Sequence, residues 1–132
     1  MMTAPISNSP GRILVVDNDV KLRTMLSLML TGHGYEVSQT DNGEEAVALH
    51  RRQPFDLVIT ELAIDGQDGF QTIMELRQEP GRAKIIAIAG ATLLPADFRL
   101  RIAEHLGAQF VLAKPFQPEQ LLSAVQNALE KT

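Results

Sequence analysis

The feature that most constrains this chain is a fivefold alternation of short apolar runs with segments whose apolar residues recur at helical spacing. The pattern predicts strands at 12–17, 35–40, 56–61, 84–89 and 110–113, and helices at 19–31, 42–52, 68–78, 95–107 and 118–130. Strands and helices that alternate over short connections imply a parallel sheet with right-handed crossovers. We therefore predict an α/β fold, a three-layer sandwich with helices on both faces of one sheet.

The strands differ in how continuously apolar they are. Ile13, Leu14, Val15 and Val16 form an unbroken apolar run, as expected of a strand covered on both faces. The segment 35–40 alternates and is less apolar, which favours a place at the sheet edge. Asp41, with Glu44 three residues later, has the pattern of a helix N-cap.

Composition limits the classes of protein that this chain can represent. Its 132 residues support one domain, and its formal net charge of −4 argues against sequence-independent nucleic-acid binding. There is no cysteine, and the apolar runs are too short for a membrane helix. Residues 1–10 lack the pattern of a secretory signal, so we expect a flexible arm at 1–10, a folded domain over 11–132 and a cytoplasmic location.

Polar residues collect where the predicted strands end, which is where parallel α/β sheets bind their ligands. Asp17, Asn18 and Asp19 follow the first strand, and Glu61 ends the third. Lys114 follows the fifth strand, after the segment 110–113. The sequence therefore predicts one pocket that contains several carboxylates and a lysine.

Four stretches in this order and spacing resemble the receiver domain of two-component response regulators, of the single-domain chemotaxis type. They are Ile13 to Asp19, Asp56 to Leu62, Gly66 to Gly69, and Gly107-Ala108 together with Ala113 to Phe116. The resemblance covers about residues 12–130. It implies a flavodoxin-like (βα)5 fold, strand order 2-1-3-4-5, and a cis peptide bond between Lys114 and Pro115.

The resemblance also implies a chemistry: receivers accept a phosphoryl group from a histidine kinase onto an aspartate that helps to hold Mg²⁺. Asp17 and Lys114 match the family pattern. Three positions in the pocket depart from it, because Asn18 replaces a metal-binding acid, Glu61 replaces the phosphoaccepting aspartate, and Ala89 replaces a hydroxyl residue. A fourth departure, Val111, replaces the aromatic residue that accompanies switching.

These departures predict that the ordinary phosphorylation does not occur. Glu61 is one methylene longer than aspartate, and phosphoryl transfer depends on accurate positioning and charge neutralisation. Asn18 has one negative charge less, so we expect at most a weakened Mg²⁺ site at Asp17, Asn18 and Glu61 and no required cofactor. Glu61 is either a built-in mimic of the phosphorylated state, held by Lys114, or part of a degenerate site.

Two other hypotheses remain open at this point. Asp65 or Asp19 could serve as a relocated phosphoacceptor, although such loop carboxylates are more often turn residues or caps. Alternatively, the run from Asp17 to Val20 is similar to the nucleophile motif of haloacid-dehalogenase-like phosphatases, which would make the chain a small phosphatase.

The preferred hypothesis is a non-enzymatic signalling module that works by binding protein. The resemblance implies that a histidine kinase or a downstream effector binds the face formed by 95–107, 110–113 and 118–130. We expect no nucleic-acid or membrane partner. On the helix at 95–107 we expect Phe98 in the core and Arg99 and Arg101 facing solvent.

Overall fold

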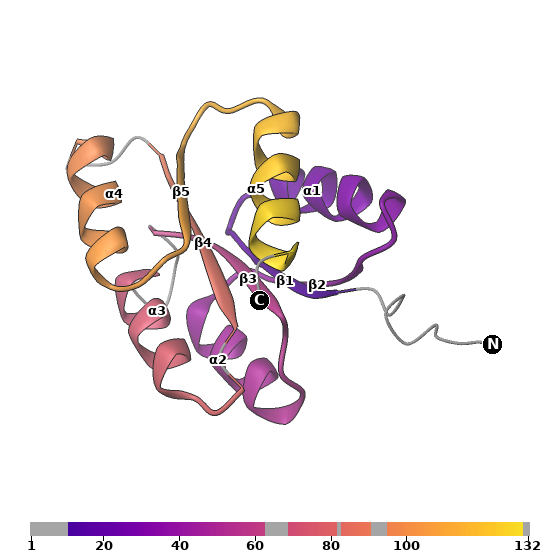
Figure 1. Ribbon diagram of the computed structural model, residues 1–132, viewed down its shortest axis with the longest axis horizontal. Coiled ribbons are helices and arrows are strands. Elements are labelled where there is room, and N and C mark those ends of the chain that lie inside the picture. Colours follow the sequence, from indigo (N-terminus) through magenta and orange to yellow (C-terminus); the bar gives the residue numbers. More distant parts are fainter. Residues whose placement is uncertain (1–10, 63–68, 82, 91–94, 131–132) are drawn as a thin grey trace.

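The computed structural model describes residues 11–62, 69–81, 83–90 and 95–130. Strands and helices alternate through these residues as the sequence predicts (Figure 1). In chain order they are β1 (Arg12–Val16), α1 (Val20–Gly32), β2 (Glu36–Thr40), α2 (Gly43–Arg52), β3 (Leu57–Glu61), α3 (Gly69–Gln78), β4 (Lys84–Ala89), α4 (Ala96–His105), β5 (Phe110–Ala113) and α5 (Pro118–Glu130).

The five strands form one parallel sheet in the order β2-β1-β3-β4-β5, which confirms the predicted flavodoxin-like topology. The register aligns the ends of neighbouring strands, with Val16 beside Thr60 and Ala89 beside Ala113. β2 lies at the edge, as its alternating sequence indicated. Because all strands run the same way, the residues that follow β1, β3, β4 and β5 reach one rim of the sheet.

Two apolar layers hold the sheet between its helices. On one face, alternate strand residues pack against α2, α3 and α4, and the central contributors from the sheet are Leu14, Val58, Ile85 and Ala87. On the other face, the intervening residues pack against α1 and α5, and the central contributors are Ile13, Val15, Ile59 and Ile86. Since the side chains of a strand point alternately to its two faces, only a continuously apolar strand can fill both layers.

Several local details differ from the sequence predictions. The N-cap of α2 is Asn42 rather than Asp41, because the Asn42 side-chain oxygen accepts a hydrogen bond from the Glu45 amide at 2.8 Å. Phe98, predicted to be in the core, is 43% exposed on α4.

The Lys114–Pro115 bond is cis, as the resemblance implied. None of the helices in the described part of the chain is long and apolar enough to span a membrane.

Candidate functional site

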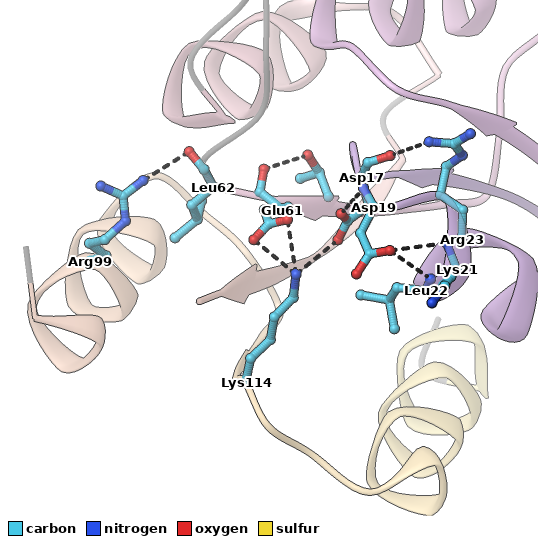
Figure 2. Close-up of polar contacts among 10 residues, drawn as sticks. Asp17, Asp19, Lys21, Leu22, Arg23, Glu61, Leu62, Arg99 and Lys114 are labelled. Atoms are coloured by element: carbon cyan, nitrogen blue, oxygen red, sulfur yellow. Dashed lines mark hydrogen bonds and ion pairs between the residues drawn. The ribbon is translucent and has the colours of Figure 1, made fainter. Parts of the chain in front are cut away.

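Lys114 joins two buried carboxylates at the rim of the sheet (Figure 2). Its Nζ lies 3.0 Å from both Oε1 and Oε2 of Glu61 and 3.3 Å from Oδ2 of Asp17. Asp17 is 1% exposed and Glu61 is 6% exposed, whereas the Lys114 side chain is 26% exposed. The three residues that the sequence placed in one pocket therefore form one compact ionic cluster.

The close approach depends on a glycine at the end of β4. A Cβ atom on Gly90 would lie 3.3 Å from Cδ of Lys114 and 3.4 Å from Oε1 of Glu61. A Cβ on Gly69, at the start of α3, would lie 2.5 Å from the carbonyl oxygen of Glu61. The two glycines thus leave room for the lysine on one side of Glu61 and for helix α3 on the other.

Burial and charge act in opposite directions on the protonation of Glu61. Burial, together with the neighbouring Asp17 carboxylate, raises the pKa of Glu61 to about 7, although Lys114 favours the charged form. Burial alone would lower the pKa of Lys114, but the two carboxylates outweigh it and raise that pKa. Lys114 therefore stays positively charged at neutral pH, while Glu61 carries its full negative charge only above about pH 7.

Asp17 and Asp19 have distinct structural roles next to this cluster. Oδ1 of Asp17 accepts a hydrogen bond from the Asp19 amide at 2.8 Å, so both oxygens of Asp17 are engaged. Asp19 is exposed and caps α1, because its Oδ1 accepts hydrogen bonds from the amides of Lys21 and Leu22. Asp19 therefore stabilises the start of a helix, as a loop carboxylate often does.

Among the described residues, the other predicted site positions contribute no side-chain contact to the Lys114 ammonium group. Asn18 is exposed beside Asp17, and Ala89 is fully buried at the end of β4. Val111 is half-buried and packs against the core on the α4 side. Asp65 lies outside the described residues.

The donor set at the rim is only a partial match for Mg²⁺, which prefers several carboxylate and water oxygens. Asp17 and Glu61 supply the right atoms, but three of their four carboxylate oxygens already contact Lys114. Among the described residues, no group of three or more acidic or histidine side chains is arranged to hold a metal ion. A metal would have to compete with the lysine for the same oxygens.

Arg99 is a site residue that the sequence prediction missed. It was expected to face solvent, but its Nη2 donates a hydrogen bond of 2.9 Å to the carbonyl oxygen of Leu62, the residue after Glu61 (Figure 2). Its guanidinium also lies 5.0 Å from the ring centroid of Phe70 on α3. Helical spacing alone could not reveal this contact, because it depends on how α4 packs beside the end of β3.

Comparison with known proteins agrees with the fold. The family model of the response regulator receiver domain matches residues 13–126. The transcriptional regulatory protein GlrR of Escherichia coli K12 is 34% identical over 128 residues, which cover 96% of this chain and 28% of GlrR. The chain thus spans little more than a quarter of the length of that relative.

Solved structures show the same likeness. A candidate response regulator from Chloroflexus aurantiacus J-10-fl superposes with a TM-score of 0.83 at 31% identity, over 92% of this chain and 99% of the other. The receiver domain of a sensor histidine kinase from Pseudomonas aeruginosa PAO1, with a magnesium ion coordinated in its active site cleft, gives a TM-score of 0.80 at 30% identity, over 92% and 99%.

The chain therefore belongs to the response regulator receiver domain family of two-component signalling. This membership supports a protein partner, since receivers signal through kinases or effectors. It gives no support to the phosphatase hypothesis.

Proposed function

We propose that this receiver works without phosphorylation and signals by binding a protein partner. The observation that carries the proposal is the contact of both Glu61 carboxylate oxygens with Lys114 at 3.0 Å. The resemblance assigns the position of Glu61 to the phosphoaccepting aspartate of the family. The lysine that would neutralise an incoming phosphoryl group is already engaged by a resident side chain.

The chemistry of the pocket supports this proposal. To attack phosphorus, a carboxylate must have a free oxygen and must be aligned with the leaving group. Here both oxygens of Glu61 are bound to a cation that stays charged. Ala89 also offers no hydroxyl to bind a phosphoryl oxygen, and Asn18 removes one charge from the acidic pair that would hold a metal.

The bidentate contact favours the mimic hypothesis over a merely degenerate site. A phosphorylated aspartate would place anionic oxygens near Lys114, and Glu61 extends its own anionic oxygens toward the same atom. Because the pKa of Glu61 is about 7, the strength of this mimicry falls below neutral pH. If Glu61 is only a remnant, Glu61→Gln will leave partner affinity unchanged.

The decisive test is direct phosphorylation by a small-molecule donor. The purified protein is incubated with Mg²⁺ and either acetyl phosphate or phosphoramidate, and its intact mass is recorded over time. We expect no stoichiometric adduct. An acid-stable, base-labile phosphoryl adduct that maps to Glu61 would overturn the proposal.

A matched variant shows that the assay can detect a receiver on this scaffold. Restoring the family residues by the combined changes Asn18→Asp, Glu61→Asp and Ala89→Thr should give a protein that takes up phosphate in the same reaction. Any one of these changes alone should give less adduct. If a single variant formed as much phosphoryl adduct as the triple variant or more, the three departures together would not control phosphorylation.

The same experiment tests a relocated phosphoacceptor. An adduct on Asp19 or Asp65 that disappears when that residue becomes alanine would establish a working receiver of an unusual kind. Asp19 is an unfavourable nucleophile because its Oδ1 already accepts two hydrogen bonds as the cap of α1.

We expect Mg²⁺ to bind weakly and to be unnecessary for partner binding. Its ligands would be Asp17, Asn18 and Glu61, and it would have to displace Lys114 from the oxygens of Asp17 and Glu61. We expect the partner, a histidine kinase or a downstream effector, to bind the face formed by α4, β5 and α5. On that face Phe98 is exposed and the strand β5 is only half-buried over Phe110 to Leu112.

A further inference from the structure

We propose that Arg99 couples the Glu61 pocket to helix α4, and so replaces the missing hydroxyl and aromatic residues of the family's usual relay. This inference rests on the proposed function, because it describes how the state of the Glu61 pocket reaches the surface to which a partner binds. The observations that carry it are the contacts of Arg99 with two neighbouring elements. Figure 2 shows the first of them, the hydrogen bond to Leu62.

The carbonyl oxygen of Leu62 is a junction between three elements. It accepts a hydrogen bond from Nη2 of Arg99 on α4 at 2.9 Å and another from the amide of Gly69 on α3 at 3.2 Å. The Leu62 amide in turn donates to the carbonyl oxygen of Ile88 on β4 at 2.9 Å. A small shift of Leu62, the residue after Glu61, would therefore change hydrogen bonds to α3, α4 and β4 together.

Arg99 is held in place by more than this hydrogen bond. Its guanidinium lies over the ring of Phe70, 5.0 Å from the centroid, in the geometry of a cation–π contact. A hydrogen bond from a charged donor is stronger than one between neutral groups. The arginine thus links α4 both to the end of β3 and to the first turn of α3.

Ala89 and Val111 stand where the family's relay residues would transmit a change to the face formed by α4, β5 and α5, and neither can do so by a polar side-chain contact. Ala89 is fully buried and has no hydrogen-bonding side chain, and Val111 is an aliphatic residue packed against the core. Arg99 provides a polar connection where these two residues provide none. Loss of the Glu61 charge would weaken its contact with Lys114, move the neighbouring residue Leu62, and change the position of α4 through Arg99.

The test is amide hydrogen exchange across α4 (Ala96–His105), measured in the full chain at pH 8. Arg99→Met keeps the length of the side chain but removes the charge and the hydrogen bond. We expect exchange in α4 to become about tenfold faster, since hydrogen bonds to charged groups carry more free energy than neutral ones. Arg101→Met, an exposed arginine on the same helix, is the matched control and should leave exchange unchanged.

A double-mutant comparison separates coupling from a purely structural role. Glu61→Gln should alter α4 exchange in the wild-type and Arg101→Met backgrounds, and should have no effect in Arg99→Met. Arg99→Lys should restore part of the coupling. If Arg99→Met does not fold, by its far-UV circular dichroism, the comparison is made with Arg99→Lys, where a reduced Glu61→Gln effect is expected.

Two results would overturn the inference. One is equal α4 exchange in Arg99→Met and Arg101→Met. The other is a Glu61→Gln effect of the same size with and without Arg99. Neither result depends on phosphorylation, so the inference can fail while the mass measurement still supports a phosphorylation-independent receiver, and the reverse also holds.

Discussion

Replacing Glu61 by glutamine should stabilise the protein at pH 8 and have little effect at pH 5. Glutamine keeps the size of the side chain and can still accept a hydrogen bond from Lys114, but it cannot ionise. In the folded wild-type protein, burial and Asp17 raise the pKa of Glu61 from 4.5 to about 7. The folded state therefore binds a proton more tightly than the unfolded state between these two pH values.

The sign follows from this difference in proton binding. Stabilisation by the raised pKa is fully present below about pH 4.5 and is lost as the pH rises through about 7. The full shift would correspond to ~3 kcal/mol, at ~1.4 kcal/mol per pH unit. Since the Lys114 side chain is 26% exposed and water screens the cluster, we expect Glu61→Gln to raise the free energy of unfolding at pH 8 by ~1–2 kcal/mol. Lys114 keeps its proton throughout this range and adds no slope.

The assay is urea unfolding of the wild type and of Glu61→Gln at intervals from pH 5 to pH 8.5. The quantity to plot is the difference in the free energy of unfolding, because contributions from other titrating groups cancel in it. Glu104→Gln, an exposed glutamate on α4, is the control for the loss of a glutamate side chain. Parallel pH profiles for the wild type and Glu61→Gln would refute the assigned electrostatics of the pocket.

Four further substitutions test other parts of the structure. Lys114→Met removes the cation between two buried carboxylates, and at pH 8 it should lower the free energy of unfolding by ~3 kcal/mol in urea titrations. Gly69→Ala would place a Cβ 2.5 Å from the Glu61 carbonyl oxygen, and in thermal melts it should destabilise the protein by about 2–3 kcal/mol. Gly32→Ala, whose Cβ would have nothing within 4 Å, should stabilise the protein by about 0.5–1 kcal/mol in the same thermal melts. Burial lowers the pKa of His50, although the nearby Glu79 carboxylate acts in the opposite direction. The stability that neutral His50 contributes is therefore present above pH 6.5 and is lost as the pH falls. The urea midpoint of His50→Gln should decrease less on acidification than that of the wild type.

The arrangement of strands and helices was predictable because it depends on local patterns. The continuously apolar run Ile13 to Val16 predicted a strand buried on both faces, and the sheet places it next to the centre. The edge position of β2 followed from its weaker, alternating pattern. In both cases the signal is the period of apolar residues, which needs no knowledge of distant parts of the chain.

Details set by competition between neighbours were harder to predict. Asp41 and Asn42 both suit an N-cap, and only the backbone at the start of α2 selected Asn42. Phe98 lies at helical spacing from core residues, yet it is 43% exposed, because the rotation of α4 depends on its contacts with β4, β5 and α3. Arg99, the next residue, turns inward as a result.

The sequence by itself determined the fold class, the order of the elements and the presence of Asp17, Glu61 and Lys114 at strand ends, since parallel strands bring their carboxyl ends to one rim. The tertiary structure alone decided how these groups meet. The distances of 3.0 Å and 3.3 Å to one lysine arise from the register of four strands and from the space left by Gly90. Burial in that arrangement, which no local pattern encodes, brings the pKa of Glu61 to about 7.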